Sequence, residues 1–102
     1  MEQKRDFIYV DDAISAIVNS SQVSNHKIIN VGSGVSTSFN QIIETINSQF
    51  NLKIMPKYIK KEFAYIENLQ ADTNLMESLL KIKPISVESG IEKFAKYLNL
   101  SN

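Results

Sequence analysis

The chain has 102 residues, no cysteine and a formal net charge of zero, with 43% hydrophobic and 22% charged residues. These values are ordinary for one globular domain, and they exclude disulfides, thiolate metal sites and the basic surface that nucleic acid or an anionic membrane requires. The single histidine, His26, cannot build a multi-histidine metal site. "MEQKRDF" has no signal-like apolar region and no run approaches the roughly 20 apolar residues that span a bilayer, so we expect a cytoplasmic location.

The first predicted elements are a strand and a helix. The run Asp6–Val10 is short, aromatic and β-branched, which predicts a strand. Asp11 and Asp12 follow it directly and can cap the start of a helix. Ile14 and Ile17 lie at helical spacing and belong to the apolar face of that helix.

A second strand, a glycine-rich turn and a second helix come next. The run "KIINV", residues 27–31, is apolar enough to predict a strand buried on both faces. The turn "VGSGVST" follows it. Ser38 with Gln41 three residues on predicts a capping box. The helix that begins there carries one apolar stripe, formed by Phe39, Ile42, Ile43, Ile46 and Phe50.

A third strand and a third helix are predicted in the second half of the chain. The strand, Leu52–Ile59, contains Pro56, which cannot donate to a ladder, so it is an edge strand or ends there. Residues 60–70, "KKEFAYIENLQ", predict an irregular loop. The helix begins at Asp72 or Thr73, and Pro84 closes that unit.

The last predicted helix has Ser86 as its cap and Glu88 in the first turn, where a negative charge is favourable. Gly90 inside this helix costs about 1 kcal/mol relative to alanine, so we expect close packing there. The inner face is formed by Val87, Ile91, Phe94, Ala95 and Leu98.

The predicted order is therefore β-α-β-α-β-α-α. Strands that alternate with helices favour an α/β arrangement with a small, partly parallel sheet. The "KIINV" strand is too apolar for an exposed position. We therefore expect it to belong to a larger sheet whose other strands are not in this chain.

The glycine-rich turn admits two interpretations, a phosphate cradle or a structural strand-to-helix turn. A dinucleotide fingerprint places three glycines in the pattern G-x-G-x-x-G. This chain has Gly32, Gly34 and then Thr37, so the third glycine is missing, and no Gly-Lys-Ser/Thr of a P-loop occurs. The sequence favours the structural turn and keeps the cradle as an alternative.

No catalytic constellation is evident. None of the four tyrosines is followed four residues later by the lysine of a Tyr-x-x-x-Lys pair. Asp11 and Asp12 are neighbours whose side chains point apart, and helix capping is the favoured role. Lys57, Lys60 and Lys61 form a small basic cluster, favoured as a solvated face, with a contact to a ligand phosphate as the alternative. We assign no catalytic residue and no metal ligand.

Three stretches, taken in order, resemble one known family. "RDFIYVDDAISAI" resembles a signature of extended short-chain dehydrogenases that act on nucleotide sugars. "INVGSGVSTSFNQI" resembles their strand-turn-helix, and "QADTNLMESL" with "KPISVESGIEKFAKYL" resembles their C-terminal ending. Within the family, "RDFIYVDD" joined to "YIENLQADTNL" is most similar to the ADP-glyceromanno-heptose 6-epimerases of lipopolysaccharide biosynthesis, although Ala64 replaces an arginine that is frequent there.

The resemblance implies a C-terminal substrate-binding fragment, a single domain over residues 1–102 that is inactive alone. The N-terminal Rossmann half, which carries the cofactor fingerprint and the Tyr-x-x-x-Lys pair in the family, is absent. The implied parent is an isomerase that uses NAD or NADP, so we expect no cofactor bound by this chain alone. The expected partners are a nucleotide-diphosphate sugar, the Rossmann half and further copies of the chain as a homo-oligomer.

The resemblance also implies two substrate-binding residues, Arg5 and Tyr65. The family arginine of "RDF" contacts the diphosphate, which suits a planar guanidinium that donates two parallel hydrogen bonds. Tyr65 matches a substrate-contacting tyrosine of the heptose epimerases, with an ordinary half-buried tyrosine as the alternative. Asp6 is expected to hold its strand or Arg5 in place, and Asp72 to cap its helix.

Two other functions stay open. A non-enzymatic module derived from such an enzyme would self-associate, because the apolar "KIINV" strand otherwise leaves an exposed edge that can pair with another chain. A complete small nucleotide-binding α/β protein requires that Gly32-Ser33-Gly34 bind phosphate.

Overall fold

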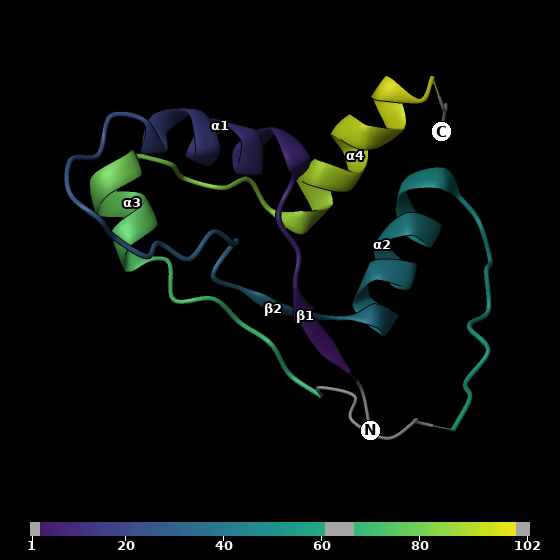
Figure 1. The fold of residues 1–102 in the computed structure, drawn as a ribbon. Helices are drawn as coiled ribbons and strands as arrows, with labels where there is room; N and C mark the ends of the chain where they lie inside the picture. The colour runs from purple at the N-terminus through teal and green to yellow at the C-terminus, as the bar shows by residue number, and fades with distance from the viewer. Residues whose placement is uncertain (1–2, 61–66, 100–102) are drawn as a thin grey trace.

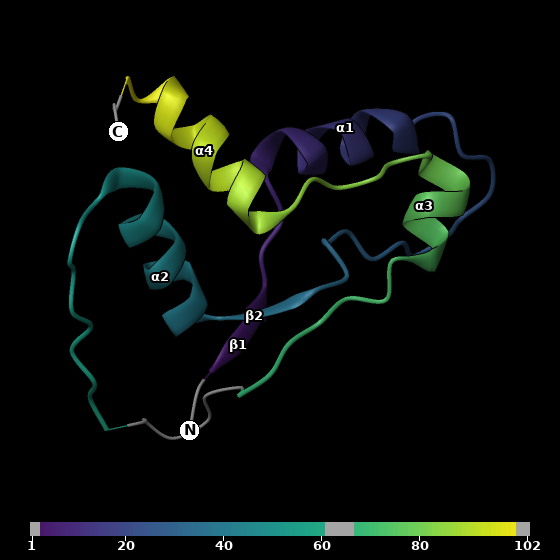
Figure 2. The same cartoon turned by 180° about the vertical axis from the view of Figure 1, so that it is seen from behind.

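The computed structural model describes residues 3–60 and 67–99 and shows four helices around a small sheet (Figure 1, Figure 2). The elements, in chain order, are β1 (Lys4–Asp6), α1 (Val10–Ser20), β2 (Ser36–Ser38), α2 (Phe39–Phe50), α3 (Asn74–Leu80) and α4 (Val87–Tyr97). The predicted combination of helices with a small sheet is confirmed, but the number, bounds and direction of the strands differ from the prediction.

The sheet of the described residues is antiparallel and has two strands. β1 and β2 pair in one register, with Lys4 opposite Ser38, Arg5 opposite Thr37 and Asp6 opposite Ser36. On the other edge of β1, the Lys4 backbone donates to Glu67 at 2.7 Å and accepts from Leu69 at 3.1 Å, which makes an isolated parallel bridge between Lys4 and Asn68. Within residues 3–60 and 67–99, parallel pairing is thus confined to one bridge, and the predicted partly parallel sheet is not confirmed.

The three predicted strands were wrong in position. The first strand was predicted at Asp6–Val10, but β1 ends at Asp6 and α1 begins at Val10. Residues 27–31 and 52–59 form no strand, and Ile28, predicted to be buried, is 92% exposed. The composition of these runs favours extended backbone, but a ladder also needs a partner strand, and among the described residues β1 and β2 alone pair as strands.

The helix caps follow the sequence more closely. The Ser38 side chain accepts from the Gln41 backbone and the Gln41 side chain from the Ser38 backbone, which confirms the capping box of α2. The Ser86 side chain accepts from the Ser89 backbone and caps α4 as predicted.

The predicted aspartate cap of α1 was wrong. Tyr9 is its N-cap residue and makes no side-chain cap bond, while Asp11 and Asp12 lie in the first turn, where their charges favour the helix dipole. The Asp12 carboxylate instead accepts a 2.9 Å bond from the Ile85 backbone. α3 begins after Thr73, which also makes no side-chain cap bond.

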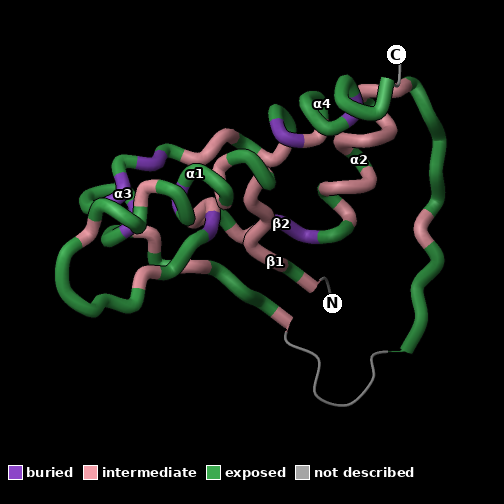
Figure 3. Tube along the Cα trace, turned by 45° about the horizontal axis from the view of Figure 1, so that its top comes forward, coloured by how far each residue is buried: buried purple, intermediate pink, exposed green. Residues whose placement is uncertain are grey.

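The buried core is small and lies between α1 and α3. Ala16, Met76, Leu80 and Ile82 form it, with Val23 and Ile29 packed against it (Figure 3). Met76 is completely buried. The Asn19 side chain fastens the two helices by a 2.7 Å bond to the Leu80 carbonyl.

A second layer of contacts joins α2 to α4 on the other side of β1 (Figure 1). The Gln49 side chain donates to the Glu88 carbonyl at 2.9 Å. Gly90 of α4 is buried, and an added Cβ would lie 3.4 Å from the Tyr9 ring. Gly90 is thus packed against Tyr9, but at a distance that is ordinary for a Cβ, so the unusually close packing predicted at Gly90 is not confirmed.

The molecule is flat and leaves much apolar surface open. Its principal extents are 48 × 37 × 16 Å, and its radius of gyration is 15.9 Å, against about 13 Å for a compact chain of this length. One face of α1 is solvent-exposed, with Val10, Ile14, Ile17 and Val18 each more than half exposed. No helix in residues 3–60 or 67–99 has the length and apolar character needed to cross a bilayer.

Candidate functional site

The carboxylate of Asp6, at the end of β1, is the most densely bonded polar group described. Its Oδ1 accepts from the Ser33 backbone and the Ser33 hydroxyl, both at 2.7 Å. Its Oδ2 accepts from the backbone of Gly34 at 2.9 Å and of Ala71 at 3.0 Å. Burial raises the pKa of Asp6, but the bonds from Ala71, Ser33 and Gly34 outweigh that effect and hold the pKa below its usual 3.8.

The glycine turn is therefore built around the protein's own carboxylate. A Cβ at Gly32 would lie 2.8 Å from the Ala71 Cβ, so only glycine lets these segments approach so closely. Gly34 has φ +79°, the left-handed region that favours glycine. Because the amides of Ser33 and Gly34 point at Asp6, they do not form an open phosphate cradle in this structure.

Arg5 precedes Asp6 on β1, and its side chain leaves the opposite face of the strand. The guanidinium donates from Nη1 to the Lys4 carbonyl at 2.8 Å, and its Cζ lies 5.9 Å from the centroid of the Phe39 ring. Phe39 in turn meets Phe7 edge to face, with the ring centroids 5.7 Å apart. Arg5 thus lies over the Phe39 ring, with further N–H groups able to donate to an anionic ligand.

The other sequence candidates are not brought into this group. Tyr65 and Lys61 lie outside the described residues, so the structure does not place them. Asp72 accepts from the Asn74 backbone at 3.1 Å, a local bond at the start of α3. Lys57 and Lys60 are exposed, consistent with a solvated face. In the part of the chain that the structure describes, no cluster of three metal-ligating side chains occurs.

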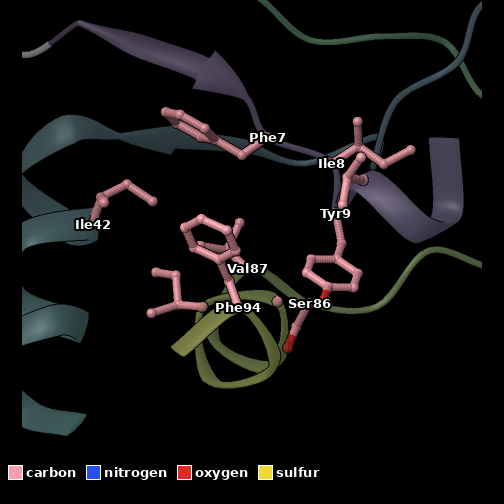
Figure 4. Close-up of a pocket in the computed structure, with 10 residues that line it drawn as sticks. Phe7, Ile8, Tyr9, Ile42, Ser86, Val87 and Phe94 are labelled. Carbon is pink, nitrogen blue, oxygen red and sulfur yellow. The ribbon is translucent and has the colours of Figure 1, made fainter. Parts of the chain in front are cut away.

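An open apolar groove of about 300 Å³ lies between α2, α4 and residues 7–10, which lead from β1 into α1. Phe7, Tyr9, Ile42 and Phe94 surround it in the close-up (Figure 4). The groove was not predicted, because its walls come from three segments that are far apart in sequence. The only sequence feature that pointed to this region was Gly90, where close packing was predicted without an identified partner. The lining has few polar groups to orient a ligand, so the groove suits an apolar occupant.

No family model matches the chain. Its sequence and fold are, however, similar to those of NAD-dependent nucleotide-sugar epimerases and related enzymes of the extended short-chain dehydrogenase family. The fold matches the C-terminal parts of epimerase structures. The similarity thus agrees with the class that the sequence motifs indicated, while no comparison singles out the heptose epimerases.

Two relatives illustrate the similarity in sequence. The chain is 33% identical over 93 residues to UDP-glucuronate 4-epimerase of Thermodesulfobacterium geofontis, and the match covers 89% of the chain. It is 30% identical over 98 residues to dTDP-4-dehydro-6-deoxyglucose reductase of Escherichia coli, which covers 94% of the chain. The chain spans only 29% and 31% of the length of these two relatives.

Two solved structures show the same relation in three dimensions. UDP-N-acetylglucosamine 4-epimerase from Methanobrevibacter ruminantium, in complex with UDP-N-acetylmuramic acid, matches with a TM-score of 0.84 and 28% identity. That match covers 96% of the chain and 32% of the enzyme. MoeE5, in complex with UDP-glucuronic acid and NAD, gives a TM-score of 0.85 at 20% identity, which shows likeness of fold alone.

Proposed function

We propose that the chain is the substrate-binding C-terminal region of an NAD(P)-dependent nucleotide-sugar epimerase, one domain over residues 1–102 that is inactive by itself. Similarity over nearly the whole chain, which spans about a third of the solved relatives, supports this assignment. The missing Tyr-x-x-x-Lys pair and the incomplete glycine fingerprint also support it. An N-terminal Rossmann half then supplies NAD or NADP and the hydride transfer.

The proposed substrate is a nucleotide-diphosphate sugar, with an ADP-heptose as the finer proposal from the motifs. The relatives named above act on or bind sugars linked to UDP and dTDP. A panel of ADP-, UDP- and dTDP-linked sugars therefore tests the nucleotide and the sugar together. Tightest binding of the ADP-linked compound supports the heptose assignment, and tightest binding of a UDP-sugar replaces it.

The observation that carries the proposal is the placement of Arg5. Its guanidinium lies over the Phe39 ring and has N–H groups beyond the one bonded to Lys4. A planar fork of this kind can bind two oxygens of a diphosphate at once. The Phe39 ring below the guanidinium is itself in edge-to-face contact with Phe7.

Chemical labelling tests this role directly, because Arg5 is the only arginine in the chain. Phenylglyoxal modifies arginine, and peptide mapping separates this product from reaction at the terminal amine. We expect UDP-glucuronic acid or an ADP-heptose to protect Arg5 in proportion to its occupancy. Equal labelling with and without every nucleotide sugar of the panel contradicts the site.

Calorimetry with two variants gives the matched measurement. Arg5→Lys keeps the positive charge but loses the planar fork, and Arg5→Ala removes both. We expect the first variant to bind about tenfold more weakly than the wild type, on the scale of one lost charge-assisted hydrogen bond. We expect no measurable heat from the second. Equal affinities for all three proteins refute a diphosphate contact by Arg5.

The proposed Rossmann partner is supported by the apolar surface that the described chain leaves open. The outer face of α1 carries Ile17, 68% exposed, and the nearby run 27–31 carries Ile28, 92% exposed. Mixing the chain with the separately expressed remainder of a related epimerase tests this idea. We expect epimerisation in the mixture and none in either part, and activity of this chain alone refutes the proposal.

A non-enzymatic, self-associating module is the second candidate, and the same exposed face favours it. Sedimentation at several concentrations measures self-association, and Ile17→Glu places a charge on the face without disturbing the core. Concentration-dependent dimers that dissociate in Ile17→Glu, with no nucleotide-sugar binding by the wild type, favour the module. A monomer that binds nucleotide sugar favours the epimerase region.

A further inference from the structure

Arg5 and Asp6 are consecutive residues whose side chains leave opposite faces of β1. On one face the Asp6 carboxylate collects four hydrogen bonds, from Ser33, Gly34 and Ala71. On the other face the Arg5 guanidinium lies over Phe39. The hydrogen bonds that fix Asp6 therefore also restrict the backbone of the neighbouring residue, Arg5.

The backbone on the other side of Arg5 is held as well. Lys4 donates to the Glu67 carbonyl at 2.7 Å and accepts from the Leu69 amide at 3.1 Å. Because β1 has only three residues, its own ladder bonds are too few to prevent fraying. Arg5 is thus the middle residue of a strand that is fixed at both ends by segments distant in sequence.

We infer that Asp6 is a positioning residue for Arg5: its carboxylate binds the glycine turn and Ala71 to β1 and so fixes the direction in which the guanidinium meets a sugar diphosphate. This inference rests on the proposed function of Arg5. It gives the glycine turn a role in binding without any contact between the turn and the ligand. The turn supplies the amides that hold the carboxylate, and the carboxylate holds the strand.

Asp6→Asn is the decisive variant, because it keeps the shape of the side chain and replaces one acceptor oxygen by a donor. The amides of Gly34 and Ala71 both point at Oδ2, and Ser33 donates twice to Oδ1. Whichever way the new amide turns, its NH2 group faces N–H or O–H donors and part of the attachment is lost.

Asp12→Asn is the matched control. Asp12 is also a half-buried aspartate that accepts a backbone N–H from a distant segment, the amide of Ile85 at 2.9 Å. That bond ties α1 to the segment before α4 and does not involve β1. A general loss of stability affects both variants, whereas a loss of Arg5 position affects only Asp6→Asn.

The first measurement needs no ligand. Because the chain has one arginine, its Nε–Hε group gives one assignable NMR signal, and the heteronuclear NOE of that signal reports how ordered the side chain is. We expect this NOE to fall in Asp6→Asn and to stay at the wild-type value in Asp12→Asn. An unchanged NOE in Asp6→Asn, or an equal fall in both variants, overturns the inference.

The second measurement is affinity for UDP-glucuronic acid and the rest of the sugar panel, made on folded protein. Freeing one backbone residue costs an entropy that corresponds to roughly a tenfold weaker affinity, so we expect that loss in Asp6→Asn and less than twofold in Asp12→Asn. Wild-type binding that requires Arg5 but is unchanged in Asp6→Asn overturns the inference and leaves the proposed function standing. No binding by the wild type removes the proposed function, and the NOE then decides alone whether Asp6 orders Arg5.

Ser33→Ala covers the case in which Asp6→Asn does not fold. This variant removes the hydroxyl bond to Oδ1, together with the local bonds between that hydroxyl and the Val35 backbone, and leaves the three backbone amides that donate to Asp6 in place. We expect a smaller fall in the Arg5 NOE in the same direction. A folded Ser33→Ala with a wild-type NOE, when Asp6→Asn is unfolded, overturns the inference.

Discussion

Replacing Gly32 by alanine is expected to be among the most damaging single-atom additions to the fold. The new Cβ would lie 2.8 Å from the Ala71 Cβ and 3.0 Å from the Asp6 Oδ2. Carbon atoms in contact prefer about 3.5 to 4.0 Å, so the two segments must separate by about 0.7 Å. Both Cβ atoms are fixed directly to backbone, and no side-chain rotation can relieve the contact.

The cost follows from the contact and from the bond beside it. Overpacking costs about 1 to 3 kcal/mol. A shift of this size also lengthens the 3.0 Å bond between the Ala71 amide and Asp6 beyond bonding distance, and a bond to a charged group contributes about 1.5 to 3 kcal/mol. We therefore expect a loss of about 3 kcal/mol in the free energy of unfolding, or roughly 12 °C or more in Tm for a domain of this size.

Urea unfolding followed by circular dichroism measures this loss, and a double variant tests its cause. Ala71→Gly alone is expected to cost up to about 1 kcal/mol, yet combined with Gly32→Ala it removes the clashing partner and restores more than 1 kcal/mol. Gly34→Ala is the control, because it combines φ +79° with a contact to the rotatable Thr73 hydroxyl and is expected to cost about 1 to 2 kcal/mol. A cost below about 1 kcal/mol for Gly32→Ala, or additive costs in the double variant, refutes the packing argument.

Three further predictions concern stability. Because the pKa of Asp6 is lowered on folding, the stabilisation by its carboxylate is complete above the ordinary pKa of an aspartate and is lost as the pH falls through the folded pKa. Urea midpoints measured from about pH 6 to about pH 3 should therefore fall less in Asp6→Asn than in the wild type. Identical pH profiles of the two proteins would contradict this prediction. Ser38→Ala removes the capping bond at a fully buried residue and is expected to cost about 1 to 2 kcal/mol, as the same unfolding assay measures. Met76→Ala empties the centre of the core and is expected to cost about 2 to 5 kcal/mol; a loss within error of zero would show that α1 and α3 do not pack around it.

The helices and their caps could be predicted from the sequence because their signals are local. Ser38 with Gln41, and Ser86 at the start of α4, each bond to a backbone group within three residues. The failure at α1 has a physical cause that is not local. Asp12, available as a cap in the sequence, bonds to Ile85 at the far end of the chain, and no pattern near Asp12 indicates that partner.

The strands could not be predicted, because a strand is defined by its neighbour. The run 27–31 has the composition of a buried strand, yet Ile28 is almost fully exposed in the described chain. The apolar pattern of this run indicates that burial is favourable, but it does not indicate which other surface covers the run. In the candidate site, Arg5 was proposed from its resemblance to a motif. The four donors to Asp6 were not predicted, because the glycine pattern favoured a structural turn without indicating which group its amides bind.

The carboxylate anchor also has a consequence for the order in which the chain folds. Asp6 accepts from groups that lie 27, 28 and 65 residues further along the sequence, so the anchor has a high contact order, and contacts of this kind close slowly. A ribosome that has just released β1 and the glycine turn must still synthesise Ala71 before the last donor can arrive. Until then, Asp6 can be held only by Ser33 and Gly34, and the strand that carries Arg5 lacks its last bond.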